Sequence, residues 1–206
     1  IDVLPNGRDP EVDQRRLDGG DRLVEFLQIA RDRHDCQMML AVGNLAAAGI
    51  DPKNIDTILV SHFHGDHISG IRAKGGAANY PNAEIMVPSG EWQFWNDASN
   101  QAKVIDNFKP GFANVKRVFD PVAKDVKQFE HGKELVPGIT SVDSRGHSPG
   151  HTAFLVASGN GKLLVTSDTV NHQILIRNPD WSLWADMDAA MAVTARTFLK
   201  SDERIS

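Results

Sequence analysis

The chain has 206 residues, of which 41% are hydrophobic and 24% charged, and its formal net charge is -5 at pH 7. This length and composition are typical of one globular domain and exclude a chain that is disordered throughout. The negative charge disfavours a nucleic-acid partner, and no apolar run approaches the roughly 18–20 residues of a membrane span.

The first part of the chain gives only local signals. Residues 1–22 are polar and predict a loop, while apolar residues at helical spacing within 23–30 predict a short helix. A second helix is expected at 38–48, with Gly49 at its end. Cys36 is the only cysteine, so an intrachain disulfide is excluded. The compartment, cytoplasmic or periplasmic, therefore stays open for what we expect to be a soluble protein without a membrane partner.

The remaining elements are predicted mainly by short apolar runs between turn residues. We expect strands at 57–61, 83–87, 126–129, 139–143, 152–157 and 162–166, and helices at 89–96 and 187–199. Ser89 is the expected N-cap of the first of these helices. A turn at Pro137-Gly138 is expected to join 126–129 to 139–143, and Ser158 to Gly161 predicts a hairpin. This order favours a mixed α/β layer fold with loops gathered at one sheet edge.

The densest chemical motif directly follows the strand expected at 57–61. His62, His64, Asp66 and His67 lie within six residues, and imidazole and carboxylate are the usual ligands of zinc, iron and manganese. On an extended stretch His62 and His64 point the same way, and Gly65 leaves room for a bend that turns the next two side chains toward a second position. A solvated loop is the alternative, but three histidines rarely follow an apolar strand so closely.

Two further candidates follow later strands. His147 lies in the loop Gly146 to Thr152, which glycine and proline residues fix between two apolar runs, and Asp168 lies at the end of the run 162–166. Alone, a loop histidine is more often simply exposed, and an aspartate after a strand is more often a cap or turn residue. The ordered set of all six residues is the specific signal for a two-metal site.

These motifs resemble those of the metallo-β-lactamase superfamily, in particular its methyl-parathion-hydrolase-like and lactonase-like branch. The resemblance runs from about 41 to 199. The segments that carry it are Asn44 to Pro52, Ser61 to Gly70, Tyr80 to Glu84, Glu91 to Trp95, Val136 to Ile139 and Gly146 to Thr152.

The resemblance implies an αββα sandwich, of the α/β (α+β) class, and a division of the chain. Residues 1–40 do not resemble the family and are expected to form an atypical N-terminal segment. Residues 41–206 are expected to form the metallo-β-lactamase-fold hydrolase domain. The family's first strands and its last ligand histidine find no match, so we expect an incomplete sandwich, truncated before the last metal-ligand loop.

The resemblance also implies two divalent metal ions, with zinc favoured and manganese, cobalt or iron as alternatives. His62, His64 and His147 would bind the first ion, Asp66 and His67 the second, and Asp168 would bridge them together with a hydroxide. Asp66 would also act in catalysis by orienting the hydroxide. The implied activity is metal-dependent hydrolysis of an ester, lactone or phosphotriester, including organophosphates.

Several points remain open from the sequence. Trp95 is the implied aromatic wall of the substrate pocket, although a place in the core is the better interpretation of Trp92, Phe94 and Trp95 as a group. His151 is expected to hydrogen-bond near the ligands, and His172 is a weak substitute for the missing histidine. Sheet edges left without a strand predict pairing of two copies in a homodimer. The competing functions are an inactive or weakly metal-binding fragment and an iron oxygen enzyme on the same scaffold.

Overall fold

The structure is a computed structural model, which describes residues 44–201. The loop and short helix expected within 1–30, most of the helix expected at 38–48, and Cys36 lie outside the described residues. The last turn of that second helix is present at 44–47, and Gly49 follows it with a φ of 71°. The Gly49 amide donates to the carbonyl of Ala46 and the Ile50 amide to that of Leu45, which is the helix end that a glycine favours.

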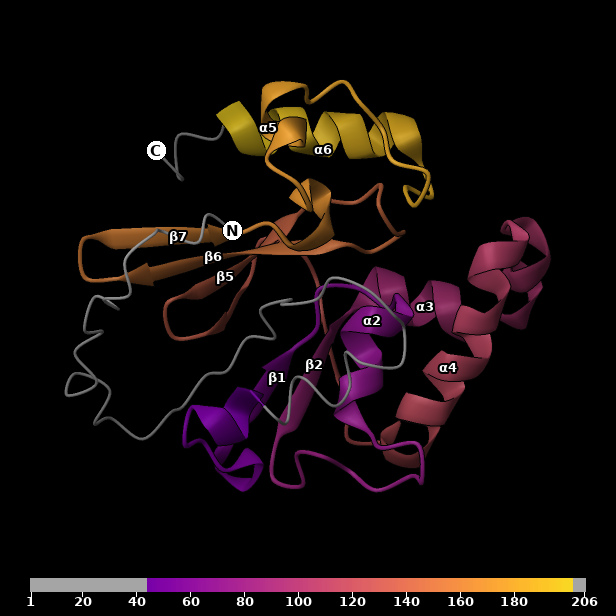
Figure 1. The fold of residues 1–206 in the computed structure, drawn as a ribbon, viewed down its shortest axis with the longest axis vertical. Helices are drawn as coiled ribbons and strands as arrows, with labels where there is room; N and C mark the ends of the chain where they lie inside the picture. Colours follow the sequence, from indigo (N-terminus) through magenta and orange to yellow (C-terminus); the bar gives the residue numbers. More distant parts are fainter. Residues whose placement is uncertain (1–43, 202–206) are drawn as a thin grey trace.

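Four layers make up the described part of the chain (Figure 1). Two sheets are stacked in the middle, α5 (Ile174–Arg177) and α6 (Ala189–Ser201) cover one outer face, and α2 (Gly65–Ile68), α3 (Ser89–Asn96) and α4 (Lys109–Phe119) cover the other. This arrangement confirms the αββα class that the motifs predicted. None of the described helices is long and apolar enough to cross a membrane.

The first sheet is parallel and has the order β1-β2-β3. Its strands are β1 (Thr57–Leu59), β2 (Glu84–Pro88) and β3 (Lys127–Phe129). Because the strands are parallel, their carboxyl ends share one edge. The loop from Val60 to His64 and the helix α3 therefore start at the same edge of the molecule.

The second sheet is antiparallel and has the order β4-β5-β6-β7. Its strands are β4 (Glu134–Val136), β5 (Ile139–Asp143), β6 (Thr152–Ser158) and β7 (Gly161–Val165). Ser158 pairs with Gly161 across the hairpin, and Gly159 has a φ of 56°, as the sequence predicted for this turn. The end of β5, the start of β6 and the end of β7 thus lie at one edge.

One predicted connection was wrong. The turn at Pro137-Gly138 joins β4 to β5, whereas β3 belongs to the other sheet and pairs with β2. The three residues of β4 are too few to stand out from the polar residues around them. Gly138 has a φ of 82°, and a Cβ there would lie 2.6 Å from the carbonyl oxygen of Ala157, so the turn requires glycine.

Two details of the helices also differ from the sequence prediction. Helix α3 has the predicted bounds, but Pro88 is its N-cap, and the Ser89 hydroxyl donates instead to the carbonyl of Phe129. Helix α4 lies in the unassigned stretch 97–125 and begins with Lys109 and Pro110. Proline suits the first turn of a helix but conceals its periodicity in the sequence. The buried face of α4 consists of Phe112, Val115, Val118 and Phe119.

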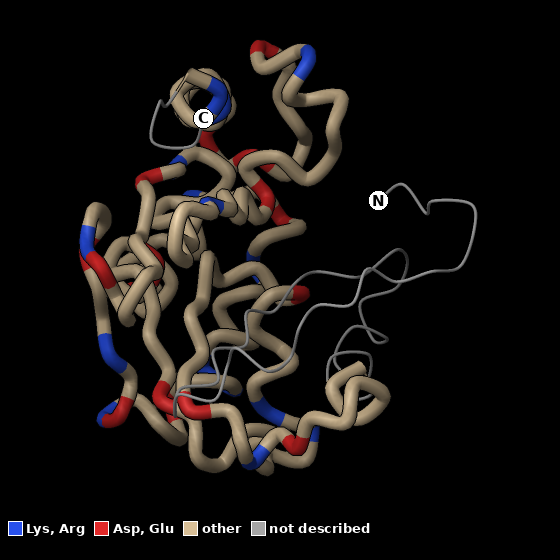
Figure 2. The backbone as a smooth tube through the Cα atoms, turned by 90° about the vertical axis from the view of Figure 1, so that its left-hand side faces the viewer, with Lys and Arg blue, Asp and Glu red and all other residues tan. Residues whose placement is uncertain are grey.

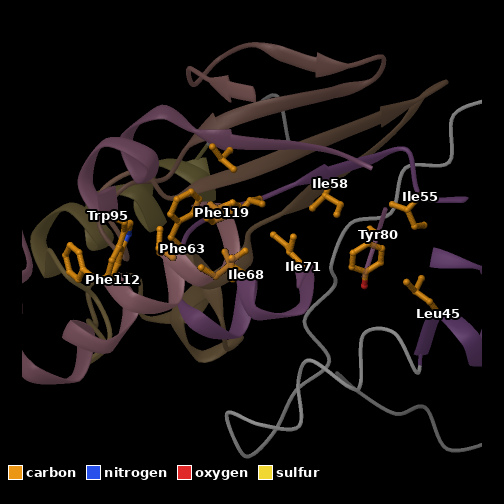
Figure 3. Close-up of a cluster of buried hydrophobic side chains, with 14 residues drawn as sticks. Leu45, Ile55, Ile58, Phe63, Ile68, Ile71, Tyr80, Trp95, Phe112 and Phe119 are labelled. Atoms are coloured by element: carbon orange, nitrogen blue, oxygen red, sulfur yellow. The ribbon is translucent and has the colours of Figure 1, made fainter. Parts of the chain in front are cut away.

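The largest hydrophobic cluster fills the space between the parallel sheet and the helices α2, α3 and α4 (Figure 3). Ile58 enters it from β1, Phe63 from the loop after β1, and Ile68 from α2. A second cluster with Leu59 and Phe154 joins the two sheets. The loop from Val60 to His64 is therefore anchored by buried side chains before and within it, which holds its polar residues in place.

Candidate metal centre

The six predicted ligand residues come from three separate segments that meet at the common edge of the two sheets. His62 and His64 lie in the loop after β1, and Asp66 and His67 in the first turns of α2. His147 lies between β5 and β6, and Asp168 in the 3-10 helix η7 (Ser167–Val170) that follows β7. The two sheets are joined here because the Thr152 amide donates to the carbonyl of Ser61.

The first group of ligand atoms consists of His62, His64 and His147, whose atoms lie within 4.8 Å of one another. His64 Nδ1 is 2.9 Å from His147 Nε2. Two imidazole nitrogens this close either share one proton or turn both lone pairs toward one cation. Three histidine nitrogens around one point can supply three of the four ligands of a tetrahedral zinc ion.

The second group consists of His62, His67 and Asp168, again within 4.8 Å. Asp168 Oδ2 lies 3.3 Å from His67 Nε2 and 3.4 Å from His147 Nε2, so this oxygen is situated between the two groups. Asp66 Oδ2 lies 3.6 Å from His67 Nε2, and the Asp66 side chain is 26% exposed. The geometry thus brings all six residues together.

The buried polar atoms of this cluster fit a cation. His62 Nε2 and Asp168 Oδ1 are buried and have no hydrogen-bond partner among the described residues. A buried polar atom without a partner costs free energy, typically about 1–3 kcal/mol. Imidazole nitrogens and a carboxylate oxygen around the same space are the donor set that zinc and similar ions prefer. The residues therefore fit a metal site of one or two ions.

The protonation states of His62, His64 and Asp168 favour such a site. Burial and the neighbouring histidines hold the pKa of His62 well below 6.5, and burial with His147 and His67 lowers the pKa of His64 to about 3. Burial alone would raise the pKa of Asp168, but hydrogen bonds from His147 and His67 lower it overall. His62 and His64 are therefore neutral and Asp168 is ionised at neutral pH, which are the forms that bind metal.

His147 is held by a carboxylate at each ring nitrogen. Its Nδ1 lies 3.1 Å from Asp186 Oδ1, opposite the Nε2 that approaches Asp168. Asp186 is itself fixed, because its Oδ2 accepts from the Leu183 amide and from the guanidinium of the buried Arg196. Such a carboxylate behind a histidine sets the orientation of the ring and increases its basicity as a ligand.

Sequence reasoning missed Asp186, Arg196 and Glu91. Asp186 lies in a stretch without a pattern, so nothing in the sequence indicated its contact with His147. Arg196 falls on the buried stripe of α6 with Ala192, Ala195 and Leu199, which was a usable signal. Glu91 precedes Trp95 by one helical turn and accepts a hydrogen bond from its indole. Arg196 and Glu91 share one feature, which is a charged residue on an otherwise buried helix face.

Trp95 lies in the core, as the sequence favoured for this aromatic group, and it does not line the cavity beside the cluster, contrary to the pocket role that the resemblance implied. Its side chain is 1% exposed and packs against Phe112 in the main core, because its indole is drawn inward by the hydrogen bond to Glu91 (Figure 3). The cavity beside the cluster has a volume of about 420 Å³ and is lined instead by Phe94, Phe108 and Trp184 among others. Phe108 stacks on His64, with ring centroids 5.2 Å apart.

Two other histidines have defined places. His151 is fully buried near His62, and its Nδ1 lies 2.8 Å from the hydroxyl of Ser144 and 3.1 Å from that of Thr169. It is thus hydrogen-bonded near the ligands, as expected. His172 is exposed and accepts a hydrogen bond from the Ile174 amide at Nδ1. It belongs to neither group of ligand atoms, so it is not a substitute ligand in this structure.

Comparison with known proteins agrees with this geometry. The family model of the metallo-beta-lactamase superfamily matches residues 18–199. The N-acyl homoserine lactonase AttM of Agrobacterium fabrum is 31% identical over 140 residues, which are 64% of this chain and 48% of AttM. The chain therefore spans about half the length of the curated relatives that it matches.

Solved structures show the same likeness. AidC, a dizinc quorum-quenching lactonase in complex with the product N-hexanoyl-L-homoserine, is 27% identical with a TM-score of 0.71. The match covers 78% of this chain and 57% of AidC. The hydrolase AbOPH of the β-lactamase superfamily is 28% identical with a TM-score of 0.70, covering 76% of this chain and 56% of AbOPH.

Proposed function

The chain belongs to the metallo-beta-lactamase superfamily, and from this premise we propose that it binds two divalent metal ions and hydrolyses a lactone or a related small ester. The observation that carries the proposal is the convergence of six ligand residues from three segments, with buried His62 and Asp168 atoms left for a cation. Zinc is the favoured metal, because the donor set suits it and AidC is a dizinc enzyme.

Each residue has a role in this proposal. His62, His64 and His147 would hold the first ion, Asp66 and His67 the second, and Asp168 would bind both from its position between them. The bound ions would polarise the carbonyl under attack and make water a nucleophile at neutral pH. Asp66, the more exposed of the two carboxylates, would orient the attacking water, accept its proton at Oδ2 and pass that proton to the leaving oxygen.

The substrate proposal rests on the relatives and on the cavity. AttM is named an N-acyl homoserine lactonase, and AidC was solved with an acyl-homoserine product. The cavity wall includes Val104, Ile105, Met187 and Met191 in addition to the aromatic residues, so it suits an apolar chain attached to the reacting group. We therefore favour a lactone with an acyl chain over a phosphotriester.

The test is hydrolysis of N-hexanoyl-L-homoserine lactone by the purified chain, together with elemental metal analysis. We expect about two equivalents of metal and turnover that a chelator abolishes and added zinc restores. The variant Asp168→Asn keeps the size of the side chain but weakens the hold on both ions, so turnover should fall by roughly 100-fold or more. Asp125→Asn, at an exposed aspartate away from the cluster, is the matched control.

The same experiment distinguishes the proposed function from the alternative functions. Full metal occupancy with hydrolysis at the background rate would contradict the proposal and support a metal-binding domain without activity. Iron in the purified protein with uptake of oxygen would support an oxygen enzyme instead. Turnover that is unaffected by Asp168→Asn would contradict the assignment of this residue.

A further inference from the structure

Glu91 is a completely buried carboxylate that accepts four hydrogen bonds. Its Oε2 accepts from the Phe63 amide and from the Trp95 indole, each at 2.8 Å. Its Oε1 accepts from the Ser148 hydroxyl and from the Gly150 amide, each at 2.6 Å. These four donors satisfy both oxygens of an ionised carboxylate.

The donors come from the two loops that carry the first group of ligands. Phe63 lies between His62 and His64, and Ser148 directly follows His147. One oxygen of Glu91 therefore holds the loop after β1, and the other oxygen holds the loop between β5 and β6. Phe63 and Ser148 are 28 and 57 residues from Glu91 in the sequence. Local structure therefore cannot fix the position of one loop relative to the other.

The contact between α3 and the second loop is also close at the backbone. A Cβ at Gly150 would lie 2.3 Å from the Glu91 amide nitrogen, and a Cβ at Gly90 would lie 3.1 Å from Gly150 Cα. Only glycine fits at Gly150, since the clash would be with backbone atoms. This close approach is what lets the short Glu91 side chain reach both loops.

We propose that Glu91 is a positioning residue for the first metal ion, which sets the separation of His64 and His147 by clamping the two loops that carry them. The proposal rests on the metal site of the proposed function. His64 Nδ1 and His147 Nε2 are 2.9 Å apart, and a shift of either loop would change this distance directly. None of the four hydrogen bonds of Glu91 involves either histidine, so Glu91 acts through the backbone of Phe63 and through Ser148 and Gly150.

The chemistry of the clamp requires a carboxylate. All four partners are donors, and an amide in its place would offer one oxygen and direct its own N–H groups at two of them. Burial raises the pKa of Glu91, although the four hydrogen bonds act against this. Burying an ionised group costs stability. We therefore attribute the presence of Glu91 at this position to its effect on the geometry of the metal site.

The test measures cobalt affinity of the full chain by competition with a chelator, with the visible spectrum of the bound cobalt as a second readout. Glu91→Gln and the milder Ser148→Ala should each weaken binding of the first ion by about tenfold or more, as is usual for groups that orient ligands. Both should also change the cobalt spectrum, because the coordination geometry changes. Glu130→Gln, at an exposed glutamate, is the matched control.

The double variant Glu91→Gln/Ser148→Ala gives a second check. Removing the Ser148 hydroxyl takes away one donor that the new amide would face, so the combined loss should be smaller than the product of the two single losses. If Glu91 only stabilised the fold, thermal unfolding of the metal-free variants would change while the affinity and spectrum of the folded protein stayed the same.

Other outcomes decide between the two proposals. Unchanged cobalt affinity in Ser148→Ala and in folded Glu91→Gln would overturn the positioning role and leave the proposed function intact. If Glu91→Gln does not fold, the affinity and spectrum of Ser148→Ala decide alone. Absence of cobalt binding by the unaltered chain would overturn the metal site, and with it both proposals.

Discussion

At the scale of single residues, His147 differs from His62 and His64, because its pKa is raised whereas theirs are lowered. Burial disfavours its protonation, but hydrogen bonds to Asp168 and Asp186 outweigh burial and raise its pKa from 6.5 to about 9 in the metal-free chain. A proton therefore occupies His147 at neutral pH, and a metal ion must displace it. The two carboxylates that orient this ring thus also strengthen its binding of a proton, and this proton would compete with the metal ion for the ring.

The first prediction concerns the pH dependence that follows. A base whose pKa rises on folding contributes stability that is fully present below the unfolded value of 6.5 and is lost as pH rises through about 9. The metal-free chain should lose this contribution over that window, as urea titrations in chelator would show. Metal affinity should rise over the same window by about tenfold per pH unit, since one proton is displaced.

A flat affinity profile between pH 6.5 and 9 would contradict this assignment of the proton. The variant Asp186→Asn removes one of the two carboxylates and should move the rise in affinity to lower pH. This shift separates His147 from other groups that titrate in the same range.

At the scale of elements, the loop that carries His147 packs against the start of α6 and the residues just before it. The amides of Met187 and Asp188 donate to the carbonyls of His147 and Gly146. Gly146 has a φ of 129°, and a Cβ there would lie 2.1 Å from the Ala192 amide nitrogen. The helix and the ligand loop thus form one unit, in which Gly146 permits both the backbone angle and the close contact.

We expect Gly146→Ala to lower the free energy of unfolding by about 2–4 kcal/mol, because it adds backbone strain and a clash with a helix. Urea unfolding in the presence of chelator measures this effect without a contribution from metal. Gly75→Ala is the matched control, since a Cβ at Gly75 has no atom within 4 Å. Equal stability of the two variants would show that α6 moves away at little cost.

The elements also show how far the sequence could predict this protein. The convergence of the candidate ligands was predictable because His62 to His67 form one local motif, and His147 and Asp168 each follow a recognisable strand. The supporting contacts were not, because Asp186 and Glu91 act on residues far away in the chain. The packing of Trp95 against Phe112 was not predictable for the same reason, since Phe112 lies on α4, the helix that Pro110 and Gly111 concealed.

At the scale of the whole molecule, each sheet ends in a strand that lacks a second neighbour among the described residues. The strand β1 pairs with β2 alone and β7 with β6 alone. A cavity of about 300 Å³ lies between these edges, and Leu163 of β7 is 60% exposed. Unpaired edges with apolar side chains favour pairing with another chain.

We therefore expect the 206-residue chain to associate through these edges, with a homodimer as the simplest product. Analytical ultracentrifugation over a range of concentrations should show mass increasing with concentration. Leu163→Lys, which adds a charge at the edge, should reduce the association, whereas Lys124→Gln on an exposed turn should not. A single monomeric species at high concentration would contradict this expectation.

The charge distribution is consistent with a small-molecule partner. Figure 2 shows Lys and Arg positions interspersed with Asp and Glu positions along the described backbone. A groove that binds nucleic acid would instead collect positive charge along its length. The absence of a nucleic-acid partner thus stays a prediction that the charge pattern favours.

The ligand residues that meet at the sheet edge are distant in the chain, and this has a kinetic consequence. His64 and His147 are separated by 83 residues, and His67 and Asp168 by 101. Closing the long chain segments between such residues costs conformational entropy, so we expect their contacts to form late in folding. A metal ion would then find its complete set of ligands only beyond the folding transition state, so it would slow unfolding far more than it would speed folding. Metal would in this way determine the lifetime of the native chain rather than the rate of its formation.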